Sequence, residues 1–309
     1  MTEIYALDPG FPGAGRVLKE LSKAFPKVKY VNLTQKEIDV DWKPPATIFL
    51  PAWHPQYDEI IRMWGDHDHL ISLWTSPPLQ SEMVPQELEY LRKILYFLDT
   101  GKIHALWLGD KNWLPLIKKG GRKVFYAPYP VTLPTQRRTE MREKIENVSL
   151  FGPLHPRKNV LTQLIAAKMA NVFVHVTDTR NLQANSLDSL AGATCVFHDW
   201  LSEPEYENLL LDHIDLGLQV SIPGVESFSY VAWDHISRGI PCLTTVSWAP
   251  SELRVLDHAN PELIAMLIRS AEINDKDSGY WRQYALDYAQ MANAKCRETL
   301  EAQLGINLT

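Results

Sequence analysis

Two carboxylates, Glu226 and Asp234, stand eight residues apart within the segment 223–242. Glu226 comes just before an amphipathic run, Asp234 lies inside it, and the run ends at Gly239 before an apolar stretch. This order predicts a loop acid, a helix and a strand. The first N–H groups of a helix lack backbone partners and can hold a phosphate, while the two acids can accept hydrogen bonds from sugar hydroxyls. The segment therefore predicts a nucleotide-sugar site.

The spacing of the two acids limits what they can do together. Eight residues of helix turn through about 80° and rise about 12 Å, so both acids cannot grip one atom but can contact opposite ends of an extended ligand. Taken alone, the pair is better explained by one acid at a helix N-terminus and one at the surface.

Three further features follow predicted strands, where open α/β sheets bind ligands. Arg157 and Lys158 stand at the start of a predicted helix and suit a diphosphate, although a solvated charged cap explains them as well. Gly13 and Gly15 belong to a glycine-rich turn that lets backbone approach a phosphate or sugar, or is only a tight turn; it matches neither a Walker loop nor GxGxxG. His54 follows another strand and is a candidate to contact a sugar hydroxyl, or a structural histidine.

These residues need elements that position them. Short apolar runs alternate with helical patterns, which predicts doubly wound parallel sheets. For the first domain we expect strands at 4–7, 28–33, 47–51, 70–74, 105–108 and 124–127, and helices at 16–25, 57–65 and 86–98. For the second we expect strands at 148–151, 172–176, 196–198, 216–220 and 240–246, and helices at 159–169, 203–211, 261–273 and 280–304. The polar stretch 131–146 is predicted to be the linker.

Composition excludes several classes of protein. The 309 residues carry a net charge of −6, which argues against a protein that mainly neutralises nucleic acid. The three cysteines lie far apart, and the chain begins with a strand-like run rather than a signal-peptide pattern, so a cytoplasmic protein is expected. The run Asp66-His67-Asp68-His69 has no further spaced ligand nearby, so we expect no metal there. The basic cluster Lys118, Lys119, Arg122 and Lys123 is a solvated loop or a site for an anion or membrane surface.

Over nearly its whole length the chain resembles the GT-B glycosyltransferases of the large retaining family 4, also called group 1. The resemblance is specific in residues 150–245 and only architectural before residue 130. That family has a Glu, seven residues and a second acid, followed by a Gly-x-Pro. Here Glu226, Phe228, Asp234, Gly239 and Pro241 keep this spacing, and a strand-Gly-x5-Lys motif matches Gly152 and Lys158. The sequence departs from the family pattern where Asp234 replaces the usual Glu, Ser229 the usual Gly, and Pro153 the usual Arg.

The resemblance implies an α/β GT-B fold of two Rossmann-like domains facing each other across a cleft. Residues 1–133 would bind the acceptor, residues 147–285 would bind the nucleotide sugar, and a C-terminal helix at 286–309 would pack back on the first domain. It implies metal-independent transfer of a hexose or pentose with retention, and no cofactor besides the nucleotide-diphosphate sugar as co-substrate.

The resemblance also assigns roles to residues. Glu226 would contact the donor sugar, Asp234 the ribose, and Arg157 with Lys158 the diphosphate. Backbone amides around Phe228 and Ser229 would support the leaving phosphate. In the first domain, Gly13 and Gly15 would line the cleft, and His54 would lie near the sugar as a second catalytic candidate.

Other readings of the same sequence remain open. A non-catalytic GT-B-like binding or scaffold protein is one, and a phosphorylase-like or epimerase-like enzyme of the same fold is another. The acceptor is not identified by any motif: a saccharide, a lipid-linked or other anionic acceptor, a small metabolite and a modified base are all candidates. The basic cluster at 118–123 favours an anionic acceptor or peripheral contact with a membrane.

Overall fold

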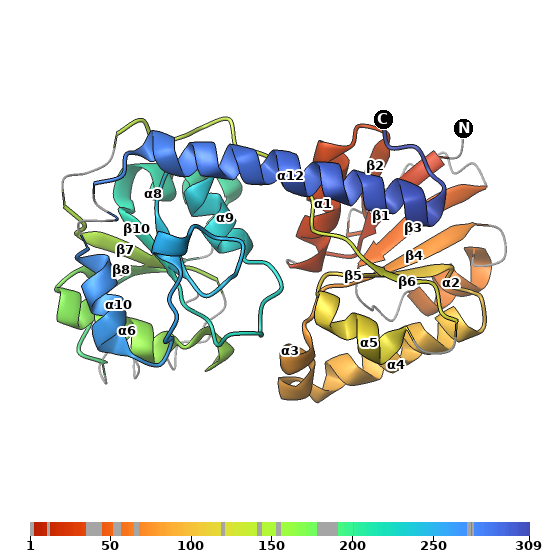
Figure 1. Ribbon diagram of the computed structural model, residues 1–309, viewed down its shortest axis with the longest axis horizontal. Coiled ribbons are helices and arrows are strands. Elements are labelled where there is room, and N and C mark those ends of the chain that lie inside the picture. Colours follow the sequence, from red (N-terminus) through yellow and green to blue (C-terminus); the bar gives the residue numbers. More distant parts are fainter. Residues whose placement is uncertain are drawn as a thin grey trace. The chain divides into compact units, whose positions relative to one another are not determined.

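The computed structural model describes residues 3–10, 13–34, 45–51, 57–64, 68–118, 121–140, 144–152, 156–177, 191–199, 201–270, 273 and 275–309. It divides into two compact units. The first comprises residues 1–132 and 289–309, and the second comprises residues 133–288. Each unit contains a parallel sheet with helices on both faces (Figure 1).

The first sheet has the strand order β2-β1-β3-β4-β5-β6. Its strands are β1 (Glu3–Asp8), β2 (Val28–Asn32), β3 (Ala46–Pro51), β4 (His69–Trp74), β5 (Ala105–Leu108) and β6 (Val124–Tyr126). The helices between them are α1 (Ala14–Ala24), α2 (Tyr57–Trp64), α3 (Pro78–Met83), α4 (Pro85–Asp99) and α5 (Leu114–Ile117), with a 3-10 turn at Lys111–Trp113. The central strands are buried along their length, as expected for a sheet covered on both sides.

One hydrophobic core fixes the first sheet to its helices. Ile48, Leu50 and Leu70 project from the strands and pack with Ile94 and Leu98 of α4. The spacing of four between these two helix residues puts them on one face of α4. Burial of a side chain of this size contributes roughly 1.5–3 kcal/mol each, so the apolar stripe of α4 determines its position on the sheet.

The second sheet has the strand order β11-β10-β7-β8-β9. Its strands are β7 (Asn147–Leu150), β8 (Phe173–Val176), β9 (Thr194–Phe197), β10 (Leu216–Gln219) and β11 (Cys242–Thr244). The helices are α6 (Val160–Ala170), α8 (Glu203–His213), α9 (Tyr230–Ile236) and α10 (Pro261–Ile268), with 3-10 turns at Pro156–Lys158 and Ser251–Leu253. The helix α12 (Ser278–Leu304) begins in this unit and ends in the first.

From residue 133 on, the polar stretch predicted as a linker belongs to the second unit and is anchored there. Arg138 is buried there, and its guanidinium donates to the carbonyls of Leu210 and Leu211, at 3.2 and 2.6 Å for its Nη2. A carboxylate oxygen of Asp215 accepts from the backbone N–H groups of Glu146 and Asn147 at 3.0 and 2.8 Å. A chain that looks hydrophilic in sequence is thus held by buried charged side chains.

The later turns of α12 pack on the first unit, which confirms the expected return of the C-terminal helix. The side chain of Asn293 closes a reciprocal pair of hydrogen bonds with the backbone of Val131, at 2.9 and 2.8 Å. Cys296 and Leu300 are fully buried below it. In the described part of the chain, no helix combines the length and the apolar character that a membrane crossing needs.

Candidate functional site

The topology of the second sheet singles out one position for a ligand. The chain builds β7, β8 and β9 in one direction and then places β10 on the other side of β7. In open α/β sheets, ligands bind outside the carboxyl ends of the strands at such a switch point, because the two loops there diverge. Lys158 follows β7 and Glu226 follows β10, so both side chains come from the loops of this switch point.

Lys158 and Glu226 meet as an ion pair. The Lys158 ammonium donates to Glu226 Oε1, and the two side chains are 14% and 13% exposed. The second carboxylate oxygen of Glu226 is buried without a hydrogen-bond partner among the described residues. A buried acceptor without a partner costs about 1–3 kcal/mol, so the carboxylate is ready to accept a further donor such as a sugar hydroxyl.

Burial also changes the acidity of Lys158. Loss of hydration, together with the nearby Arg157 charge, lowers the pKa of Lys158 to about 8, while the Cys242 thiol acts weakly in the opposite direction. An ammonium that has lost hydration gains more from a second anion than an exposed lysine does. The site can therefore favour a ligand with two or more negative charges.

Two buried glutamines, which the sequence analysis did not single out, hold the switch-point loops. Gln163 on α6 donates to the Lys158 carbonyl at 2.6 Å and accepts from the Val220 N–H at 2.9 Å, which links the loops after β7 and β10. Gln219 donates to the Phe151 carbonyl at 2.9 Å. Both glutamines interrupt apolar runs in the sequence, and this interruption is the sequence feature that could have marked them as buried polar residues.

The loops are also joined through their backbones. The Ile222 N–H donates to the Arg157 carbonyl at 3.0 Å. Asn159 adopts a left-handed conformation, with φ of 53°, directly before α6, and its side-chain amide donates to the His258 carbonyl. Asparagine tolerates this conformation better than most residues. The Arg157-Lys158-Asn159 turn is therefore fixed from three sides.

Phe228 and Ser229 lie at the start of α9. The Ser229 hydroxyl caps the helix by accepting from the Ala232 N–H at 3.3 Å. The ring of Phe228 stacks on Trp248, with centroids 5.0 Å apart and planes 17° apart. Aromatic pairs of this kind add about 0.5–1.5 kcal/mol beyond burial. The start of α9 is thus held rigidly beside the loop that carries Glu226.

Asp234 is engaged inside the protein. Its side chain is 6% exposed and receives hydrogen bonds from Arg238 Nη1 and from the Tyr206 hydroxyl, each at 3.4 Å. Arg238 in turn pairs with Glu207 at 3.0 Å. The ribose contact implied by the family pattern would require Asp234 to keep or exchange these partners.

His235, next to Asp234, is a buried structural residue that the sequence analysis passed over. Its Nδ1 donates to the Val231 carbonyl at 2.7 Å, so Nε2 is left to accept from the Ser149 hydroxyl at 2.6 Å. Burial lowers the pKa of His235 to about 4. The neutral imidazole therefore ties α9 to β7 beneath the switch point.

In the first unit, the switch point lies between β1 and β3. Gly15 sits in the first turn of α1, where an added Cβ would lie 2.3 Å from both carboxylate oxygens of Asp8. Gly13, at the start of the same helix, has open space around its Cβ position. Gly15 therefore has a packing role against Asp8. The second catalytic candidate, His54, lies outside the described residues.

Comparison with solved structures identifies the fold. HepE from Anabaena in complex with UDP-glucose aligns at 14% identity with a TM-score of 0.66, over 98% of this chain and all of that chain. AviGT4, a glycosyltransferase involved in avilamycin A biosynthesis, aligns at 11% identity and TM-score 0.61 over 99% of both chains.

Other comparisons define the limits of the likeness. A mutant of TarM from S. aureus, in complex with fondaparinux, α-GlcNAc-glycerol and UDP, aligns at 11% identity and TM-score 0.57 over 84% of this chain. The chain spans 54% of that TarM chain. No protein-family model and no curated protein sequence matches the chain. With two parallel α/β domains and these neighbours, the chain has the GT-B fold that the sequence predicted.

Proposed function

We propose that the chain is a glycosyltransferase that moves a hexose or pentose from a nucleoside diphosphate sugar to an acceptor with retention of configuration. The observation that carries the proposal is the buried Lys158–Glu226 pair at the switch point of the second sheet. A buried cation next to a carboxylate with one unpartnered oxygen matches a ligand that carries a diphosphate beside sugar hydroxyls.

Donor binding would redistribute the charges of this site. The diphosphate takes Glu226's place as the partner of Lys158, with Arg157 beside it, and Glu226 then accepts hydrogen bonds from the sugar. Amides around Phe228 and Ser229 are proposed to support the phosphates, and Asp234 the ribose. In the first unit, Gly13 and Gly15 are proposed as further donor-binding residues, and His54 as a second catalytic residue near the sugar.

The proposed reaction proceeds on one face of the sugar. The bond from the anomeric carbon to the diphosphate oxygen breaks, and its electron pair leaves with the nucleoside diphosphate. The acceptor hydroxyl oxygen bonds to the same face of the anomeric carbon, and its proton passes to the departing phosphate oxygen. Lys158 and Arg157 stabilise the negative charge that develops there, which is why we propose that the reaction needs neither a bound metal nor another cofactor.

The solved complexes of one structural neighbour bear on the donor. HepE has been solved with UDP, with UDP-glucose, and with UDP and glucose, which supports a uridine-linked donor for this chain. The acceptor stays open among a saccharide, a lipid-linked or other anionic molecule and a modified base. Cytoplasmic location, with peripheral membrane contact for a lipid-linked acceptor, is part of the proposal.

The test is a thermal-shift screen against UDP, GDP, ADP, TDP and their common sugars, each with and without EDTA. A ligand at a hundred times its Kd stabilises the protein by about 2.7 kcal/mol, which is a readable shift. We expect one nucleotide to stabilise the chain equally with and without EDTA. The hit is then assayed for donor hydrolysis, and the anomeric configuration of the released sugar is read by proton NMR. Inversion at the anomeric carbon, or stabilisation that EDTA abolishes, would contradict the mechanism.

A non-catalytic binding protein of the same fold is the second candidate, and the state of Asp234 favours it. The carboxylate that the family pattern assigns to the ribose is held by Arg238 and Tyr206. Stabilisation by a nucleotide sugar without any hydrolysis or transfer, over a panel of saccharide and lipid-linked acceptors, would support this candidate over the enzyme.

A further inference from the structure

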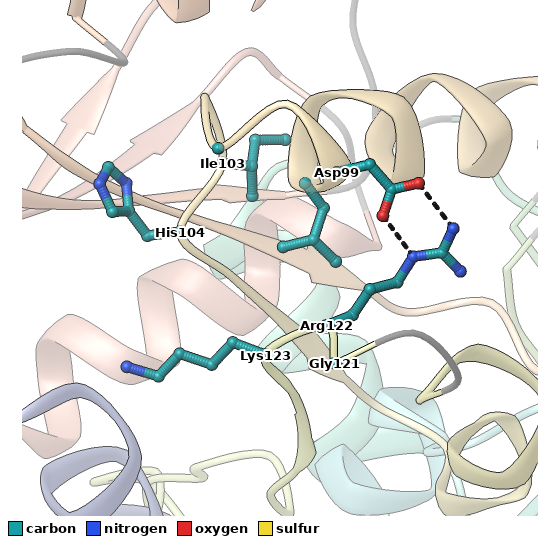
Figure 2. A pocket seen from close by; sticks show the side chains of 8 residues that line it. Asp99, Ile103, His104, Gly121, Arg122 and Lys123 are labelled. Carbon is teal, nitrogen blue, oxygen red and sulfur yellow. Dashed lines mark hydrogen bonds and ion pairs between the residues drawn. The ribbon is translucent and has the colours of Figure 1, made fainter.

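The amino-terminal edge of the first sheet contains two adjacent pockets that the proposed transferase does not use. The inner pocket, of about 170 Å³, is lined by Thr47, His69, Ile71, His104, Lys123 and Leu304. The outer pocket, of about 310 Å³, shares His104 and Lys123 with it (Figure 2). The residues come from the starts of β3, β4, β5 and β6, the opposite ends of the strands from the switch point.

The basic cluster identified in the sequence separates into two roles here. Arg122 is engaged: its Nε and Nη2 donate to both oxygens of Asp99, at 2.6 and 2.7 Å. Lys123 extends to the other side of the strand, the side on which His104 lies (Figure 2). In the part of the chain that the structure describes, no ion-pair partner of Lys123 is found. Its charge is available to a ligand.

His104 presents a fixed donor to the same space. Its Nδ1 accepts a hydrogen bond from the Leu70 N–H at 3.2 Å, so the neutral ring must carry its proton on Nε2. Burial, followed by the positive influence of His69 and Lys123, lowers the pKa of His104, while Asp68 opposes the shift. The ring therefore offers an Nε2–H donor and no second acceptor.

Thr47 supplies the third polar group. The residue lines the inner pocket and is 1% exposed, and its hydroxyl is buried without a hydrogen-bond partner among the described residues. A buried hydroxyl without a hydrogen-bond partner lowers the stability of a protein by about 1–3 kcal/mol, and a valine side chain would fill the same space without that cost. A hydroxyl at this position is explained if a ligand pairs with it.

The charges of the pocket decide between an anion and a cation. Asp68, the carboxylate whose charge acts on His104, is buried and accepts from the Ala46 N–H at 2.6 Å. Asp99, which lines the outer pocket, is paired with Arg122. Lys123 and His104 both line the pocket, and the ammonium and the Nε2–H are hydrogen donors, which disfavours a metal ion and favours oxygen acceptors. A water molecule takes about 30 Å³ in the liquid, so the inner pocket has room for about five such groups, enough for a tetrahedral oxyanion.

We propose that this edge of the first sheet binds a small oxyanion of the phosphate class, with Lys123, His104 and Thr47 as its donors. The outer pocket then receives whatever the phosphate is attached to, so a phosphate monoester binds more tightly than inorganic phosphate. The site lies within the first unit and does not depend on the proposed transferase activity.

The experiment is calorimetric titration of the full chain with inorganic phosphate and with glycerol 3-phosphate, at constant ionic strength set by chloride. Because phosphate can also enter the donor site, every titration is repeated in Lys158→Ala. We expect binding to persist in Lys158→Ala, to weaken about tenfold or more in Lys123→Gln, and to remain unchanged in the matched control Lys118→Gln, whose side chain is exposed outside the pockets.

Thr47→Val separates a binding role from a structural one. The variant keeps the β-branched shape, so without phosphate it should melt at the same temperature as the parent chain or higher. With phosphate its stabilisation should be smaller than that of the parent chain. Equal binding in Lys123→Gln and the parent, loss of binding in Lys158→Ala alone, or stabilisation by zinc without any effect of phosphate would each overturn the proposal.

Discussion

The two units have the same kind of sheet but different chemistry at their switch points. In the second unit, the loops after β7 and β10 bring together Lys158 and Glu226, and one oxygen of that pair has no partner among the described residues. In the first unit, Asp8 ends β1, and its two oxygens accept from the Gly10 N–H at 2.8 Å and the Tyr30 hydroxyl at 2.5 Å. The Glu226 carboxylate has one oxygen without a hydrogen-bond donor among the described residues. Both oxygens of the Asp8 carboxylate accept hydrogen bonds from within the protein.

This difference separates ligand chemistry from packing. Both regions looked alike in sequence, since each combines small residues with an acid after a strand. In the first, Gly15 is explained by the space that Asp8 occupies. In the second, the loops are tied by buried Gln163 and Gln219 around groups that internal contacts do not satisfy. Rigid loops around an unsatisfied buried group are what a preorganised ligand site requires.

The largest expected effect is that of Glu226→Gln. The amide keeps the size of the side chain but loses the charge, so we expect turnover of the donor to fall about 100-fold or more. Binding of UDP should stay equal or tighten, because the diphosphate no longer displaces a carboxylate from Lys158. Turnover and calorimetry on the same preparation check both. Glu262→Gln, an exposed acid in the first turn of α10, is the control. Parent-like turnover in Glu226→Gln would remove Glu226 from the mechanism.

Acid should destabilise the second unit through its buried histidines. Burial lowers the pKa of His235 and of His175 to about 4, and His198 adds to the effect at His175. Their unfolded forms bind protons near pH 6.5, so the stabilisation is complete above that pH and is lost as pH falls toward 4. Over this pH range each histidine accounts for a loss of about 3 kcal/mol in the free energy of unfolding.

Urea unfolding at pH 7 and at pH 4.5 measures this loss. His235→Gln should be less stable than the parent at pH 7 but should show a smaller drop between the two pH values. An identical drop in the variant and the parent would mean that His235 is not kept neutral by the fold.

Lys158→Ala should weaken UDP binding by roughly 1.5–3 kcal/mol, the size of a charged hydrogen bond. The reason is that Lys158 is the buried cation of the switch point, and its substitution also leaves Glu226 without its ion-pair partner. The titration is done at pH 7, below the Lys158 pKa of about 8, so that Lys158 is charged in the parent chain. Lys168→Ala, exposed in the last turn of α6, removes the same charge from the same unit. An unchanged dissociation constant in Lys158→Ala would locate the diphosphate elsewhere.

The sequence predicted the elements better than it predicted the contacts between them. β5 occupies residues 105–108 as expected, because four apolar residues stand between polar turns. The helix α3 was missed, since Pro77-Pro78 looks like a break, although proline at the first helical position begins a helix well. The expected strand at 240–246 is limited to Cys242–Thr244, and the helix expected at 261–273 ends at Ile268.

The candidate site shows where sequence information ends. Lys158 and Glu226 are 68 residues apart, and no spacing rule reveals that they pair. The helix around Asp234 does not show from its sequence which face points to a ligand, because residues 232–236 are all buried. A helix that is buried on every side carries no polar stripe that would indicate which residues face a ligand. The partners Arg238 and Tyr206 emerge only from the folded chain.

The smallest predicted effect separates the two glycines of the first switch point. Gly15→Ala places a methyl group 2.3 Å from the Asp8 oxygens, and such overpacking costs about 1–3 kcal/mol in the free energy of unfolding. In Gly13→Ala the added methyl group meets open space, and the φ of −81° suits alanine. Alanine restricts the unfolded chain, which stabilises the fold, but it is a poorer N-cap residue than glycine. The two effects nearly cancel, so we expect the free energy of unfolding to change by no more than about 0.5 kcal/mol. Urea unfolding measures both. If UDP-sugar turnover fell in Gly13→Ala while stability did not, the open glycine would be the one that approaches substrate, and the first unit would share the ligand chemistry of the second.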